Sequence, residues 1–139
     1  MAGQPRLTTE RAQMDVTPLL PGDRQVVESY GGGRFRVSGT LYEGSVLVLP
    51  ERTRAWPVTA LAEVTLESLA PLFADESEAI AVLLLGCGPK MAMMPTALRD
   101  GLRQHGIALE PMDTGAACRT YNVLLAEERR VGAALIAVA

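Results

Sequence analysis

Apolar residues recur over short, alternating stretches in the first half of the chain, a pattern typical of β-strands. Glycines at Gly31–Gly33, Gly39 and Gly44 separate these stretches, and Pro50 ends the most apolar of them. The strands predicted in this half are residues 25–30, 34–38, 41–42, 45–49 and 56–58. Their short length and the glycine turns between them predict antiparallel hairpins.

The pattern changes after residue 65, where helical spacing and continuous apolar runs follow one another. Thr65 and Ser68 mark the start of a helix to about residue 74, Pro95 starts another that ends at Gly106, and Asp113 or Thr114 caps a third. The third helix is predicted to run to about residue 127. Continuous apolar runs predict buried strands over residues 79–85, 107–112 and 131–138.

The order strand, helix, strand, helix, strand predicts a parallel sheet with right-handed crossovers. The predicted fold is therefore α/β: a mixed sheet with a parallel C-terminal core and an antiparallel N-terminal β part. Residues 1–22 are polar, contain three prolines and show no sustained period, which predicts an N-terminal arm. With 139 residues in all, residues 23–139 are predicted to form a single α/β domain.

Composition narrows the classes of function. A net charge of −3 and an aromatic content of 4% argue against nucleic acid as a partner. Cys87 and Cys118 are far apart and His105 is the only histidine, so no metal site is expected. The N-terminus does not resemble a signal sequence, and no apolar run is long enough to span a bilayer. These features predict a soluble cytoplasmic protein with no transmembrane segment.

The loop Gly86-Cys87-Gly88-Pro89-Lys90 lies between a predicted buried strand and a helix, where α/β proteins often bind phosphates. A P-loop needs Ser or Thr after the lysine, and a dinucleotide fingerprint needs a third glycine; Met91 stands in both places. We therefore expect a tight turn and no NAD, ATP or other cofactor. Cys87 has no cysteine or histidine near it in the sequence, so a buried thiol is favoured over a reactive one.

The segment from Asp113 to Asn122 offers a second set of polar candidates. Because two parallel strands end before Gly86 and Asp113, the following loops should emerge at one sheet edge. Lys90, the only lysine of the chain, and Arg119 would then form a basic spot suited to a carboxylate or a small anion. The candidate binding residues are Gly86, Cys87, Gly88, Lys90, Asp113, Thr114, Arg119 and Asn122.

Several sequence segments resemble a small domain family of unknown function that occurs in bacteria and archaea. The family includes the mitochondrial NADH:ubiquinone oxidoreductase (complex I) assembly factor three. The matching segments are YGGGRFRVSGTLYEGSVLVLP, the pair Trp56-Pro57, LLLGCG, and MDTGAACRTYNVLLAEERRVGAALI, which together span about residues 25–138. Glu128 stands where the family usually has glycine, and Cys87 where it often has threonine. The resemblance implies a mixed-sheet α/β domain without an established enzyme activity.

Two functions remain open from the sequence. The resemblance implies a non-enzymatic protein-binding domain, similar to a complex I assembly factor, with a protein partner that the sequence does not identify. The alternative is an enzyme that binds a small molecule or anion at the strand ends, with Asp113 as base, Arg119 as anion ligand and Lys90 as electrostatic stabiliser. No nucleophile–base pair is evident for the alternative, so no catalytic residue is assigned. A homo-oligomer is compatible with either function.

Overall fold

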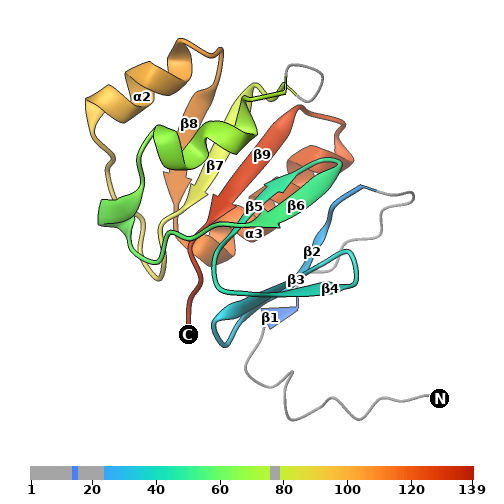
Figure 1. The fold of residues 1–139 in the computed structure, drawn as a ribbon. Helices are drawn as coiled ribbons and strands as arrows, with labels where there is room; N and C mark the ends of the chain where they lie inside the picture. The colour runs from blue at the N-terminus through green and yellow to red at the C-terminus, as the bar shows by residue number, and fades with distance from the viewer. Residues whose placement is uncertain (1–13, 16–23, 76–78) are drawn as a thin grey trace, which may run out of the picture.

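The computed structural model describes residues 14–15, 24–75 and 79–139, which form two β-sheets packed with helices (Figure 1). The four-stranded sheet is antiparallel and consists, in spatial order, of β1 (Met14–Asp15), β2 (Val27–Gly31), β3 (Arg34–Val37) and β4 (Thr40–Glu43). The five-stranded sheet has the order β6 (Arg52–Ala55), β5 (Val46–Leu49), β9 (Val131–Leu135), β7 (Val82–Gly86) and β8 (Ala108–Met112).

The five-stranded sheet is mixed, as the sequence predicts. Strand β7 pairs in parallel with both β8 and β9, whereas β5 pairs antiparallel with β6 and β9. Two α-helices, α2 (Thr96–Arg103) and α3 (Thr114–Ala126), connect the parallel strands, and two 3₁₀ helices, η1 (Leu61–Glu63) and η2 (Glu67–Leu72), precede them. The α/β class and the parallel C-terminal core are confirmed.

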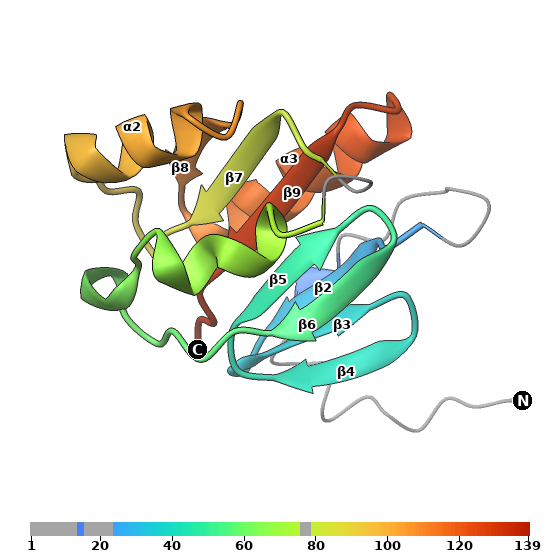
Figure 2. The same cartoon turned by 45° about the horizontal axis from the view of Figure 1, so that its top comes forward.

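Alternate side chains of the five-stranded sheet enter two separate cores, because successive residues of a strand point to opposite faces. In β7, Leu83 and Leu85 belong to the first core and Leu84 to the second. The first core lies under α2 and the 3₁₀ helices, and the second lies between the sheet, α3 and the four-stranded sheet. Figures 1 and 2 show α2 and α3 on opposite sides of the five-stranded sheet.

One predicted strand is wrong, and two observed strands, β1 and β6, were not predicted. Residues 56–58 are not a strand: Trp56 makes one further backbone bond to Ser45 and Pro57 has no N–H to continue a ladder. Trp56 and Val58 nevertheless bury their side chains in the first core. The strand paired with β5 is instead the polar segment Arg52–Ala55, a hairpin partner at the sheet edge.

The helix predicted for residues 66–74 is the 3₁₀ helix η2. Pro71 lies inside it and lacks the N–H that an α-helix requires. The carbonyl of Ser68, three residues earlier, instead accepts a hydrogen bond of 3.0 Å from Nε1 of Trp56. The predicted start of this helix is confirmed, because the backbone amide of Thr65 donates to the Ser68 hydroxyl and the amide of Ser68 donates to the Thr65 hydroxyl.

The predicted apolar strands are shorter than their apolar runs. Ladder pairing of β7 begins at Val82 rather than at residue 79, since the carbonyl of Ala79 accepts from the Arg130 side chain. Strand β9 ends at Leu135 rather than at residue 138, because the chain then crosses toward the four-stranded sheet, where Gly33 donates to the carbonyl of Val138.

Most of the predicted N-terminal arm lies outside the described residues. Within it, Met14 and Asp15 form β1 and pair with Tyr30 and Ser29 of β2. No helix in the described part of the chain combines the length and the apolar character needed to cross a membrane.

Candidate functional site

The chain segments that leave β7 and β8 meet at the C-terminal edge of the parallel strands, as predicted, and the segment that leaves β9 joins them there. The amide of Cys87 donates to the carbonyl of Met112 at 2.8 Å, and the amide of Ile136 donates to the carbonyl of Gly86 at 3.0 Å. These bonds continue the ladders one residue beyond the strands. The loop after β7 therefore starts from a fixed position between its neighbours.

Thr114 joins the three segments at this edge. Its Oγ1 accepts a hydrogen bond of 2.9 Å from the amide of Gly88 and donates one of 2.7 Å to the carbonyl of Ile136. Its own amide donates to the carbonyl of Gly88 at 2.8 Å. Thr114 is completely buried. Its hydroxyl therefore satisfies two backbone groups that would otherwise be buried without a partner.

Gly86 and Gly88 occupy positions where a larger residue would be sterically or conformationally unfavourable. A Cβ on Gly86 would lie 3.0 Å from both Cα and Oγ1 of Thr114, tighter than side chains normally approach. Gly88 has a φ of +104°, which side chains rarely adopt. The loop thus has glycine because α3 packs closely and the backbone turns, which accounts for the pattern without a bound phosphate.

Asp113 and Cys87 are both engaged at this edge. Asp113 is the N-cap of α3, and its Oδ2 accepts from the amide of Ala116 at 3.0 Å. Cys87 is a buried free thiol whose Sγ lies 3.6 Å from the carbonyl oxygen of Leu85. The carboxylate therefore stabilises the start of a helix, which is the usual task of an aspartate in this position.

Arg119 leans back over the first turn of α3, as its helical position predicts. Its Nη1 donates to the hydroxyl of Tyr30 in β2 at 3.2 Å. The Tyr30 hydroxyl lies directly over Gly115, where a Cβ would approach it to 2.5 Å. Tyr30 was not among the predicted residues. The chain gives no sequence signal for it, because its partners lie in a helix far along the chain.

Asn122 lies on the face of α3 that packs on β2. Its Oδ1 accepts from the amide of Val27 at 3.1 Å and its Nδ2 donates to the carbonyl of the same residue at 2.8 Å. The hydroxyl of the preceding residue, Tyr121, donates to the carbonyl of Gln25 at 2.8 Å. Burial raises the pKa of Tyr121 well above its ordinary value. These bonds join the helix to the antiparallel sheet.

Two exposed methionines, which the sequence analysis did not single out, follow Lys90 in the same loop. Met91 is 55% exposed and Met93 75% exposed, while Met94 is buried in the first core. Lys90 is exposed as well. The available signal was a run of apolar residues without helical or strand spacing, between Pro89 and Pro95.

The structure thus brings most predicted residues to one edge but gives them different surroundings. Gly86, Gly88 and Thr114 contact one another, whereas Asn122 faces β2 and lies buried. Over residues 14–15, 24–75 and 79–139, no three His, Cys, Asp or Glu side chains gather closely enough to hold a metal ion. Chemically, the edge offers two exposed cationic side chains, Lys90 and Arg119, and two exposed apolar ones, Met91 and Met93.

Comparisons with known proteins agree with this architecture. Residues 27–136 match the family described as protein of unknown function (DUF498/DUF598). An uncharacterized protein of Rhodobacter capsulatus is 38% identical over 110 residues, which cover 79% of this chain and 82% of the relative. The NADH dehydrogenase (ubiquinone) 1 alpha subcomplex assembly factor 3 of Xenopus tropicalis is 32% identical over 131 residues, covering 94% of this chain and 68% of that protein.

A solved structure extends the similarity to three dimensions. The crystal structure described as that of an outer membrane protein from Bartonella henselae superimposes with a TM-score of 0.76 at 36% identity. The superposition covers 84% of this chain and 97% of that chain. The two proteins therefore share their fold over most of both chains.

Proposed function

Because this chain belongs to the family of proteins of unknown function DUF498/DUF598, and is similar to a named NADH dehydrogenase assembly factor, we propose that it is a protein-binding domain. Its proposed role is non-enzymatic: it holds a partner protein during assembly of a respiratory complex I or a comparable assembly.

The observation that carries this proposal is the exposure of Met91 and Met93 beside Lys90. Exposed apolar side chains that are grouped mark surfaces that bind other proteins, and methionine is enriched at such surfaces; Met91 and Met93 are both exposed and lie two residues apart. Both lie on a loop whose start is fixed by the bonds of Gly88 to Thr114. A fixed loop start reduces the conformational entropy lost on binding.

The proposed binding surface, which we call the methionine edge, consists of Lys90, Met91, Met93 and Arg119. The remaining predicted residues, Gly86, Cys87, Gly88, Asp113, Thr114 and Asn122, support it by fixing the loop and α3. A fitting partner segment is apolar with a neighbouring carboxylate, since methionine side chains accept varied apolar shapes and both cations can pair with an acid.

The test is co-purification of partners from the native host with the full-length chain and its variants. The double variant Met91→Ser with Met93→Ser should lose the retained partner, and so should Lys90→Ala with Arg119→Ala. Both should keep a free energy of unfolding within about 1 kcal/mol of the wild type. The matched control is Val123→Ser, which truncates an equally exposed apolar side chain on α3.

Retention of the partner by both double variants, or its loss in the Val123→Ser control as well, would contradict the proposed surface. Conversion of a small-molecule substrate by the purified wild type would favour the enzyme alternative instead.

The proposal includes a domain division. Residues 23–139 would act as the binding domain, with residues 1–22 as an arm.

The proposed location is the cytoplasm. Cys87 and Cys118 are both free thiols, which suits this reducing compartment. Recovery of the protein in an outer membrane fraction, to which the description of the Bartonella henselae structure points, would contradict the cytoplasmic location.

A further inference from the structure

A cavity lined by three arginines lies at the opposite end of the parallel strands from the methionine edge. Its volume is about 100 Å³, and Arg24, Arg129 and Arg130 contribute to its wall. Pockets that hold drug-sized molecules measure about 300–1,000 Å³, so this one has room for a small ion or the end group of a larger molecule. None of these arginines belongs to the surface proposed above.

Four segments that are distant in sequence converge on this cavity and are held together by backbone bonds. The amide of Gln25 donates to the carbonyl of Pro50, which joins the start of β2 to the turn between β5 and β6. The amide of Ala81 donates to the carbonyl of Arg130, which joins the start of β7 to the link between α3 and β9. The wall therefore belongs to the folded core and not to a loose loop.

Arg24 carries a buried donor with no partner. Its Nε is buried and makes no hydrogen bond with any described residue. Its positive charge also acts on the Tyr121 hydroxyl, where it opposes the burial that raises the pKa of that group. A buried, unsatisfied guanidinium N–H costs free energy, and binding of an anion is one way in which such a donor is satisfied.

Arg130 and Arg129 leave donors available as well. Nε of Arg130 donates to the carbonyl of Ala79 at 2.6 Å, which fixes the guanidinium while its Nη atoms remain unused by that bond. Arg129 forms one distant ion pair, 3.9 Å from Glu127, with more than half of each side chain exposed. Such an exposed pair contributes little and can be replaced by a stronger ligand.

Two features of the cavity oppose the binding of an anion, but neither contributes as much charge as the three arginines. Glu51 and Glu128 also line it, yet within the described part of the chain neither pairs with a lining arginine. The C-terminus of α3 points here as well, but two of its end carbonyls are occupied, since the amides of Glu128 and Arg129 donate to those of Leu125 and Leu124. This is the Schellman arrangement, with Glu128 at a φ of +61°.

We propose that this cavity binds a phosphate group, held by Arg24, Arg129 and Arg130. A guanidinium presents several N–H donors in a plane, the geometry that phosphate oxygens accept best. Three of them from two segments suit a tetrahedral oxyanion better than a planar carboxylate, which offers only two acceptor oxygens. The ligand is either free inorganic phosphate or the terminal phosphate of a small metabolite.

The test is titration of inorganic phosphate into the full-length, ¹⁵N-labelled protein at constant ionic strength, observed by NMR. The Nε–Hε signal of Arg24 and the amides of residues 128–130 should shift saturably, with half-saturation at about 1 mM or below. Glycerol 3-phosphate in place of phosphate separates the two sources: tighter binding indicates a terminal phosphate, and weaker binding indicates the free ion. Both results support the site.

Variants assign the binding to this cavity. Arg24→Gln should weaken binding about ten-fold, the effect of one charge-assisted hydrogen bond. Glu128→Gln should tighten it by about two- to five-fold, because it removes an opposing charge. Arg103→Gln, an exposed arginine on α2 outside this cavity, is the matched control and should bind as the wild type.

Three results would overturn the proposal. They are the absence of saturable shifts, acetate binding as tightly as phosphate, and equal weakening by Arg103→Gln. Because none of the changed residues belongs to the methionine edge, these outcomes are independent of partner binding there.

Discussion

At the scale of single residues, Thr114 stabilises the edge on which the proposed partner surface is built. Its hydroxyl is hydrogen-bonded to Gly88 in the loop after β7 and to Ile136 in the segment after β9, and Thr114 is also the first residue of α3. A buried hydroxyl with both a donor and an acceptor bond contributes stability mainly because its loss leaves two backbone groups unsatisfied. The effect of its removal can therefore be large although its volume hardly changes.

We expect Thr114→Val to lower the free energy of unfolding by about 2–4 kcal/mol, since the amide of Gly88 and the carbonyl of Ile136 would lose their partner. Urea unfolding monitored by Trp56 fluorescence measures this. Thr114→Ser keeps the hydroxyl and should lose less than half as much. A valine variant as stable as the wild type would show that the two backbone groups find other partners.

The sequence indicated which polar side chains have a specific role, but not whether that role is binding or structural. Asp113 and Thr114 were predicted to lie near a site because they stand between a strand and a helix, and Asn122 because asparagine is unfavourable inside a helix unless it has a partner. The hydrogen-bond partners of Thr114 lie 26 and 22 residues away, and that of Asn122 lies 95 residues away. No local pattern encodes such pairs, so an interior polar network cannot be told from a binding site by sequence alone.

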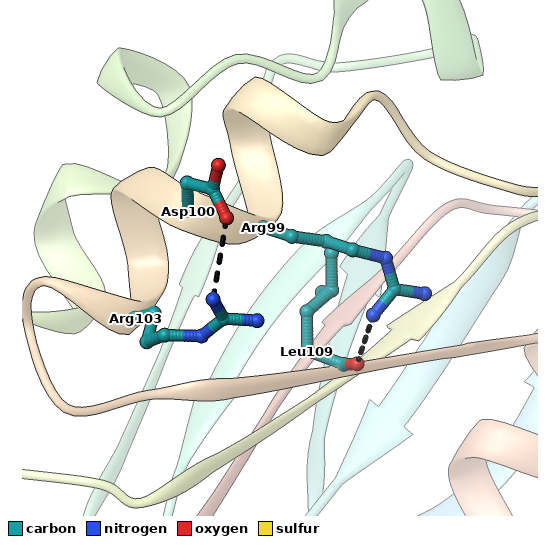
Figure 3. Close-up of polar contacts among 4 residues, drawn as sticks. All are labelled: Arg99, Asp100, Arg103 and Leu109. Atoms are coloured by element: carbon teal, nitrogen blue, oxygen red, sulfur yellow. Dashed lines mark hydrogen bonds and ion pairs between the residues drawn. The ribbon is translucent and has the colours of Figure 1, made fainter.

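At the scale of elements, the outer edge of β8 is protected against pairing with another strand. Ala108 and Met112 direct their backbone groups to β7, so the backbone groups of Leu109 and Pro111 point to the outer edge of the sheet. Pro111 has no N–H, and the carbonyl of Leu109 accepts from Nη1 of Arg99 at 3.2 Å (Figure 3). An edge strand with few free donors and acceptors is a poor template for aggregation.

The double variant Arg99→Ala with Pro111→Val should expose this edge and increase self-association. Light scattering after size-exclusion chromatography should show an average mass that rises with concentration, whereas the wild type should stay constant over the same range. Arg103→Ala is the control, because the Arg103 guanidinium pairs with the neighbouring Asp100, 3.4 Å away, while the β8 carbonyl accepts from Arg99 (Figure 3). Equal association of control and double variant would contradict the role given to this edge.

The elements differ in how well the sequence predicts them, for reasons of burial. The helix over Thr114–Ala126 and strands β7 to β9 were predicted within a few residues, because capping residues and apolar runs act locally. Strand β6 was missed because Arg52–Ala55 is polar on both faces and has its place only through pairing with β5. The 3₁₀ form of η2 depends on Pro71 and on a distant indole, which helical spacing does not reveal.

At the scale of the whole molecule, α3 joins the two sheets into one structure. Its side chains Ala117, Cys118, Tyr121 and Leu125 are buried in the core shared by both sheets. In Figure 2, α3 lies behind the five-stranded sheet, on the side away from α2. Titration of a group on this buried face therefore affects the whole fold and not only one element.

Cys118 gives the fold a defined sensitivity to alkaline pH. Burial raises the pKa of its thiol from 9.0 to about 12; the charge of Arg119 lowers it and that of Asp113 raises it, both by less. Below about pH 9 the thiol is neutral in the folded and the unfolded chain alike. Between about pH 9 and 12 the unfolded chain loses this proton and the folded protein keeps it, so stability falls as the pH rises.

We therefore expect the free energy of unfolding to fall above about pH 9 by about 1 kcal/mol for each pH unit on account of Cys118. Burial raises the pKa of Tyr121 in the same direction, so the decline should steepen above about pH 10, where an unfolded tyrosine ionises. Urea unfolding at a series of pH values measures the slope. Cys118→Ala should be less stable at neutral pH because it leaves a small cavity. Between about pH 9 and 10, however, its stability should fall less steeply with pH than that of the wild type, because the unfolded variant has one proton fewer to lose. If the variant and the wild type lose stability in parallel across that range, the thiol ionises equally in both states, and its burial in the core between the two sheets is not maintained in solution.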